Sequence, residues 1–194
     1  MSETSFSLLE RLRERPDGDA WRRLLDLYTP LLRAWLGQHA VQPADADDLV
    51  QEVLTVVIRE LPRFEHSRRA GAFRSWLRSI LVHRLRDFWR ARQHRPPATG
   101  DSAVLRHLEE LADSTSGLSR RWDEEHDRHV VRRLLELIEP EVTPSTWQAF
   151  CRVALEGKDE ETVATELGLS VNAVFIAKSR VLSALRQEGR GLLD

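Results

Sequence analysis

Apolar residues recur along most of the chain at steps of three and four, which is the spacing of one face of an α-helix. The alternation that marks β-strands is nearly absent, and glycine and proline are sparse inside the periodic segments. The pattern predicts helices over about residues 20–38, from Pro43 to Pro62, and from about Ala72 onwards. We therefore expect an all-α fold.

A second group of helices is expected from residue 126 to the end. Apolar residues from Val130 to Ile138 mark one helix, and Thr143-Pro144 suits the N-cap and first turn of the next. Two further helices meet at a break over residues 168–170.

This break fits a helix-turn-helix. Ala164 is small where the two helices would cross, Gly168 permits the turn, and Val174 would insert into the shared core. An ordinary helical hairpin is the alternative, but basic residues outnumber acidic ones in the second helix, which favours binding to DNA. Ser170 suits the N-cap of that helix. The residues expected at the DNA are Ser170, Asn172, Ala173, Ile176, Lys178, Ser179 and Arg180.

Between these groups, residues 96–125 are polar and acidic and begin with the irregular sequence PPATGDS. We expect a flexible linker with room for one brief helix around residues 104–112. The predicted organisation is thus two small helical domains, residues 1–95 and 126–194, joined by residues 96–125.

Charge is strongly segregated although the formal net charge is only −2. Residues 59–95 hold 11 basic and 3 acidic side chains, whereas residues 96–128 hold 4 and 8, and residues 40–58 hold 4 acidic and no basic ones. A local excess of positive charge in a slightly acidic chain indicates a polyphosphate partner such as nucleic acid.

The helix from Ala72 concentrates this charge. Phe73, Leu77 and their apolar neighbours form a core stripe, and Arg74, Arg78, Arg86 and Arg90, spaced at multiples of four, are expected on another face. With Phe88 and Trp89, this face suits an unpaired nucleic-acid strand, although arginine stripes on surface helices are often merely solvated. Arg68 and Arg69, in the preceding EHSRRAGA segment, either face DNA or belong to a simple connection.

Few residues suggest chemistry. Cys151 is the only cysteine, which excludes an internal disulfide and a thiolate-rich zinc site. Asp45, Asp48 and Glu52 could gather on a helix as magnesium ligands, but no second carboxylate cluster accompanies them. We expect no catalysis, no metal and no cofactor. No apolar run has the length of a membrane span and no secretory signal is present, so we expect a cytoplasmic protein without membrane insertion.

Three segments in this order resemble a known family. They are DADDLVQEV at residues 45–53, FRSWLRSI at 73–80 followed by Asp87, and GKDEETVATELGLSVNAVFIAKSRVLSAL at 157–185. Over residues 20–95 and 129–188 the chain resembles a bacterial RNA polymerase sigma factor of the extracytoplasmic-function type, which has only regions 2 and 4. The resemblance implies a protein that directs core polymerase to promoters and opens them without hydrolysis by its own chain.

The resemblance also implies residue roles. The set expected to bind core polymerase is Asp45, Asp48, Leu49, Gln51 and Glu52. The set expected at the opened −10 element is Arg68, Arg69, Arg74, Arg78, His83, Arg86 and Arg90. The helix-turn-helix would read the −35 element as duplex DNA.

The sequence departs from the family pattern at some positions. His83 stands where asparagine is usual, and Phe175-Ile176 replaces a frequently polar pair, so the promoter sequence does not follow from the resemblance. An anti-sigma factor remains open as a further partner. The alternative function is a helix-turn-helix regulator with a sensory helical domain, which leaves the basic, aromatic helix at residues 73–92 without a purpose.

Overall fold

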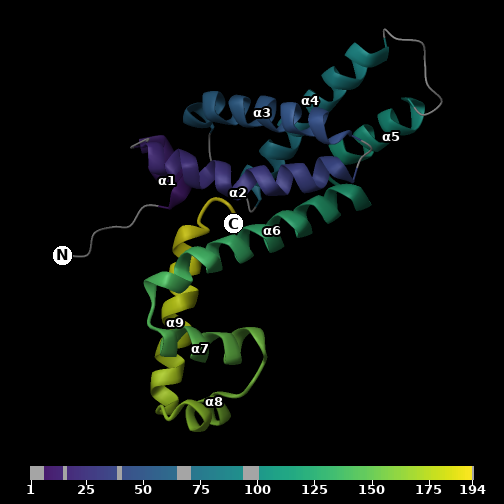
Figure 1. The fold of residues 1–194 in the computed structure, drawn as a ribbon. Coiled ribbons are helices and arrows are strands. Elements are labelled where there is room, and N and C mark those ends of the chain that lie inside the picture. The colour runs from purple at the N-terminus through teal and green to yellow at the C-terminus, as the bar shows by residue number, and fades with distance from the viewer. Residues whose placement is uncertain (1–6, 15–16, 39–40, 65–70, 94–100, 194) are drawn as a thin grey trace. The chain divides into compact units, whose positions relative to one another are not determined.

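The computed structural model describes residues 7–14, 17–38, 41–64, 71–93 and 101–193, and within them it contains helices and turns but no strands (Figure 1). The predicted all-α fold is thus confirmed. These residues divide into two compact units. Of the described residues, the N-terminal unit comprises Leu8–Val130 with residues 191–193, and the C-terminal unit comprises Val131–Arg190 with Ser7.

The first three predicted helices are present in the N-terminal unit. They are α2 (Gly18–Gly37), α3 (Pro43–Glu60) and α4 (Ala72–Gln93). Helix α2 packs against α3, and α3 packs against α4. Tyr28 and Trp35 of α2 and Phe73 of α4 are fully buried, so the apolar stripes read from the sequence meet in one core.

Helix α1 (Leu8–Glu14) was not expected. It buries Leu8, Leu9 and Leu12 and packs against α2, whose N-terminus is capped by the Asp17 carboxylate at 2.6 Å from the Ala20 nitrogen. Seven residues give too few turns for periodicity to reveal a helix.

The flexible linker is not confirmed, although its brief helix is present. Asp101–Ala112 form α5, and Gly117–Ile138 form the long helix α6. Leu111, Leu118 and Trp122 are buried, and the Trp122 ring meets that of Trp35 edge-on at 5.1 Å. The burial of these few large apolar side chains stabilises the segment although most of its residues are polar. The two units therefore divide inside α6, between Val130 and Val131, and not across residues 96–125.

The C-terminal unit comprises the end of α6, α7 (Pro144–Phe150), a π-helical turn over Cys151–Leu155, α8 (Glu160–Leu167) and α9 (Val171–Glu188). The predicted caps are confirmed: Thr143 caps α7 and Ser170 caps α9. Val174 lies in a buried cluster with Val163 and Ala164 of α8.

The turn between α8 and α9 has helix-turn-helix geometry. Gly168 ends α8 in the left-handed conformation at φ 64°, and the Leu169 N–H donates to the Ala164 carbonyl at 2.9 Å. The two helices are bent by 105°. Among the described helices, none alone is long and apolar enough to cross a membrane. Only α8 and α9 taken together reach the necessary length and apolar composition, and they are bent at the turn between them.

Candidate nucleic-acid interface

Helix α9 presents a continuous exposed strip, which we call the α9 strip. It comprises Val171, Asn172, Phe175, Ile176, Ser179, Arg180 and Ser183. The opposite side of the helix holds Val174, Ala177 and Val181, which are buried. Four residues predicted to face DNA, Asn172, Ile176, Ser179 and Arg180, therefore lie together on one accessible surface.

The other three predicted residues of this helix are used within the unit. Ser170 Oγ accepts the Ala173 N–H at 3.1 Å, and Ala173 itself is half-buried. Lys178 Nζ donates to Glu160 Oε1 at 2.8 Å, and this hydrogen bond lowers the pKa of Glu160. Lys178 therefore joins α9 to α8 and is not on the α9 strip.

Three residues of this strip were absent from the predicted set, Val171, Phe175 and Ser183, and Phe175 is the largest of them. Helical spacing could have identified Phe175, because it lies one turn before Ser179 and outside the buried positions of α9. Periodicity therefore shows that Phe175 points away from the core.

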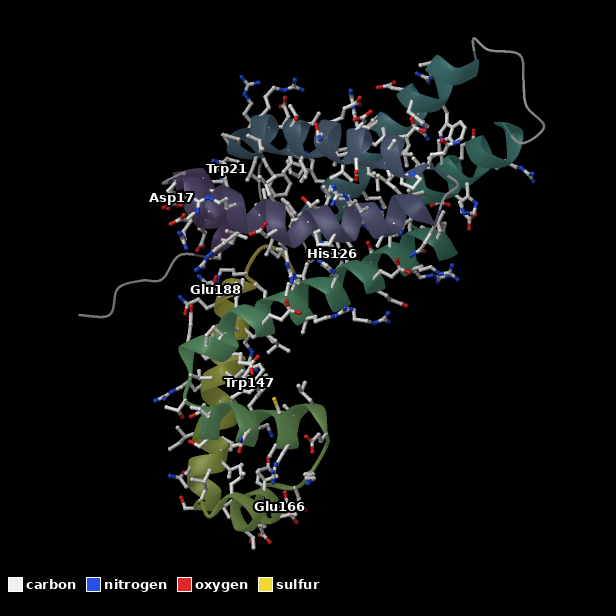
Figure 2. All side chains as sticks on the ribbon, viewed as in Figure 1. Asp17, Trp21, His126, Trp147, Glu166 and Glu188 are labelled. Carbon is white, nitrogen blue, oxygen red and sulfur yellow. The ribbon has the colours of Figure 1, made fainter. Side chains whose placement is uncertain are left out.

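Further ion pairs hold α8 in place. Glu166 accepts from Lys158 at 3.0 Å and from Arg152, and these bonds, led by that of Lys158, lower the pKa of Glu166. At the start of α8 the Asp159 side chain accepts the Thr162 N–H at 2.9 Å, which lowers the pKa of Asp159. Figure 2 shows Glu166 on α8, in the part of the C-terminal unit that carries the turn to α9.

In the N-terminal unit, the arginines of α4 do not share one face, which corrects the prediction. A step of four residues advances about 40° around an α-helix, so three such steps rotate a side chain by about 120°. Arg74 and Arg78 are directed toward α6, whereas His83 and Arg90 are exposed and Arg86 is half-exposed.

Arg74 and Arg78 are held by carboxylates of α6. Arg74 Nη1 donates to Asp127 Oδ2 at 2.7 Å, and Arg78 Nη1 donates to Asp123 Oδ1 at 3.1 Å. Arg78 also approaches the Ser119 carbonyl at 3.4 Å and is only 5% exposed. The predicted acidic linker thus supplies the partners of the predicted DNA-binding arginines.

Neighbouring contacts attach the same part of α6 to α2. The buried His126 Nε2 lies 3.1 Å from the Tyr28 hydroxyl, and its Nδ1 lies 3.0 Å from Asp127 Oδ1. His129 Nε2 lies 2.7 Å from the Leu27 carbonyl. Burial raises the pKa of Tyr28 well above its ordinary value, so this hydroxyl stays protonated. Figure 2 shows His126 on α6, and its bond to Tyr28 places it against α2.

The aromatic residues of α4 divide in the same way as its arginines. Trp76 packs on Phe64, with ring centroids 4.7 Å apart, and belongs to the aromatic cluster around Phe73. Phe88 and Trp89 are half-exposed and meet at 5.4 Å near the end of the helix. Arg68 and Arg69 lie outside the described residues.

Helix α3 carries an exposed strip that includes Asp48, Gln51 and Glu52, which we call the α3 strip. Leu49 is 2% exposed and packs in the core, because it occupies the buried side of the same helix. Its side chain is therefore not available to a partner in this structure. Asp45 is half-buried at the start of the helix.

Among the described residues, no group of three or more His, Cys, Asp or Glu side chains is arranged to hold a metal ion. Asp45, Asp48 and Glu52 do not form such a group.

Comparison with known proteins adds the family. Residues 24–95 match the model of sigma-70 region 2. The chain is 32% identical to the ECF RNA polymerase sigma factor ShbA of Streptomyces griseus over 148 residues, which cover 74% of this chain and 73% of the relative. It is 29% identical to the ECF RNA polymerase sigma factor SigD of Mycobacterium tuberculosis, covering 89% and 78%. It is 27% identical to the RNA polymerase sigma factor CarQ of Myxococcus xanthus, covering 92% and 94%.

Proposed function

Since the chain belongs to the ECF sigma factors of RNA polymerase and acts in transcription initiation, binding core polymerase and promoter DNA, we propose that it divides this work among three surfaces. These are the α3 strip, the exposed side of α4 and the α9 strip. The observation that carries the proposal is that α3 and α9 each present a continuous strip of exposed side chains beside a filled core.

The α3 strip is proposed to bind core polymerase. Asp48, Gln51 and Glu52 are exposed together, while the buried side of α3 fixes the position of the helix in the N-terminal unit. Rigid support of this kind lowers the entropy lost when a partner binds.

The exposed side of α4 is proposed to hold the unpaired −10 strand. His83, Arg86 and Arg90 supply donors to phosphates, and Phe88 and Trp89 supply half-exposed rings on which bases can stack. Binding energy from the unpaired strand would offset the cost of opening the duplex, so this chain needs no hydrolytic step.

The α9 strip is proposed to read the −35 element. The N-terminal residues of a recognition helix meet base edges in the major groove, and here Asn172 and Ile176 occupy these turns. Ser179 and Arg180 follow one turn later.

The test separates polymerase binding from DNA binding. Asp48→Ala with Glu52→Ala should weaken binding to core polymerase by at least about fivefold, the effect of roughly 1 kcal/mol at an interface. Glu124→Ala removes an exposed carboxylate from α6 and serves as the matched control. Run-off transcription should fall in parallel with polymerase binding. Unchanged polymerase binding by the α3 variant would contradict the role of the α3 strip.

The remaining partners follow from the same surfaces. We propose that the chain works in the cytoplasm, where polymerase and chromosome meet, and that an anti-sigma factor would act by covering one of the strips. The comparisons do not favour a helix-turn-helix regulator with a sensory domain.

A further inference from the structure

The α9 strip is unusual in its apolar content. Phe175 is 60% exposed and Ile176 is 51% exposed, and both lie within the first two turns of α9. Val171, at the start of the helix, is exposed as well. Three large apolar side chains thus share the strip with Asn172, Ser179 and Arg180.

These side chains are not needed to complete the core. Val174 and Ala177 already fill the cluster shared with α8, and Val181 packs with Ile138 and Phe150 in a second cluster. The exposed part of these side chains gains nothing from folding, but it gains free energy when a partner removes it from water. Phe175 and Ile176 are therefore available for binding.

Charge identifies the class of partner. Residues 171–187 contain Lys178, Arg180 and Arg186 but no acidic residue, and Arg180 and Arg186 are exposed. Duplex DNA fits this combination, because its phosphates attract the arginines and its major groove admits a helix. The major groove offers one apolar group at base edges, the C5-methyl of thymine.

We propose that Phe175 and Ile176 contact thymine methyl groups in the promoter element that α9 binds, and that Phe175 is a further specificity-determining residue. The inference rests on the proposed function of the α9 strip and extends it to the bases that are read. Asn172 and Arg180 would supply hydrogen bonds to neighbouring base pairs or phosphates.

The test removes single methyl groups. Holoenzyme assembled from the full chain and core polymerase selects duplexes from a randomised −35 region, and each thymine of the selected site is then replaced by deoxyuridine. At one or more positions the replacement should weaken binding about fourfold, the value of one buried methyl group. Phe175→Ala or Ile176→Ala should abolish that sensitivity, whereas Leu155→Ala, a residue equally exposed at 60% in the same unit, should keep it.

The outcomes are distinguishable. Tight binding that no deoxyuridine replacement alters would overturn the inference and leave the proposed function intact. A variant of Phe175 and Ile176 that keeps the full deoxyuridine effect would overturn it too, and would reassign the two side chains to a protein partner. Holoenzyme that forms but selects no −35 sequence would contradict the role of the α9 strip itself.

A second inference rests on different observations, the ion pairs between α4 and α6. Asp123 and Asp127 engage Arg78 and Arg74 from a segment that holds 4 basic and 8 acidic residues. A carboxylate accepts from a guanidinium in the same way as a phosphate does. Both carboxylates remain about one-third exposed at the edge of the contact, with side-chain exposures of 29% and 38%.

We infer that α6 occupies these two arginines in the unbound protein and yields them to the phosphates of the unpaired promoter strand. The contact is therefore autoinhibitory: single-stranded DNA must displace Asp123 and Asp127 before Arg74 and Arg78 can bind it. Farther along α4, Arg86 is half-exposed and Arg90 is exposed in the same structure.

The test compares binding of single-stranded DNA by the full chain. Asp123→Asn with Asp127→Asn should raise the affinity about threefold to tenfold, whereas the exposed control Glu124→Gln should not. Hydrogen exchange of the unaltered protein gives an independent readout, because bound single-stranded DNA should reduce the protection of residues 119–127. Unchanged affinity in a folded Asn variant, or unchanged protection on DNA binding, would overturn the inference and make Arg74 and Arg78 structural residues.

Discussion

Helices α4 and α9 both carry the basic residues expected at DNA, yet their surroundings differ. The first arginines of α4 are paired with carboxylates of α6 and Arg78 is buried, whereas the strip of α9 with Phe175 and Arg180 is exposed. A basic helix can therefore be either a binding surface or half of an internal ion-pair network. The partner, and not the arginine count, decides which of the two it is.

The largest difference between the two regions is expected when the packing of Trp122 of α6 on Trp35 is removed. Trp122→Ala deletes a fully buried ring that packs on Trp35, and it should destabilise the N-terminal unit by about 3–5 kcal/mol. Phe175→Ala removes an exposed ring and should change stability by no more than about 0.5 kcal/mol. Urea unfolding measures both, and a small loss for Trp122→Ala would mean that α6 contributes little to the unit.

The next effect concerns two arginines of the same helix. Arg78→Ala removes the hydrogen bond to Asp123 at 3.1 Å, leaves that carboxylate only Arg74 Nε at 3.6 Å, and should cost about 1–3 kcal/mol. Arg90→Ala alters a side chain that is 72% exposed and should stay within about 0.5 kcal/mol. Thermal unfolding gives the order of the two losses. Equal losses would contradict the division of α4 into a covered and an open part.

The order should be the reverse for binding of single-stranded DNA by the chain without polymerase: Arg90→Ala should have the larger effect and Arg78→Ala the smaller. Loss of a phosphate contact by Arg90→Ala should reduce the slope of log affinity against log salt for single-stranded DNA by about 0.7. Arg78→Ala should change this slope only when the carboxylates of α6 no longer bind Arg78, as in a chain that also carries Asp123→Asn and Asp127→Asn.

These differences explain what could be predicted from the sequence. Periodicity located α2, α3 and α4, because each buries a stripe with many large apolar residues. The spacing of Ala164, Gly168 and Val174 located the turn before α9. It missed the packing of α6 because Trp122, His126 and Val130, four residues apart, are embedded among charged residues. Composition averages over such a segment, while burial depends on a few side chains.

The site shows the same limit. Asn172, Ser179 and Arg180 lie on one exposed surface, because helix geometry alone decides which residues of α9 share a side. Arg74 and Arg78 were assigned to a surface that α6 covers, because sequence spacing gives the direction of a side chain but not its neighbour. Whether any of these residues touches DNA stays a prediction.

A smaller effect sharpens the account of the helix-turn-helix. Gly168 adopts φ 64°, and a Cβ placed there would meet no atom within 4 Å. Gly168→Ala should therefore lower the free energy of unfolding by about 1–2 kcal/mol, the cost of holding an alanine in the left-handed conformation, without a steric clash. Gly37→Ala, at a helical glycine that also has open space, is the matched control and should not destabilise. A neutral Gly168→Ala would show that the turn does not depend on the left-handed conformation.

The smallest effect is the response of the C-terminal unit to acid. Bonds from Lys158 and Arg152 hold the pKa of Glu166 below its ordinary value of 4.5. The stability that this carboxylate contributes is present above pH 4.5 and is lost as the pH falls through its lowered pKa, because the unfolded chain takes up the proton first. Glu166→Gln should therefore lower stability at neutral pH and have less effect in acid, as urea unfolding at several pH values can show. An equal loss at every pH would mean that Glu166 acts through packing, and that the ion pairs around α8 do not stabilise the unit that carries the α9 strip.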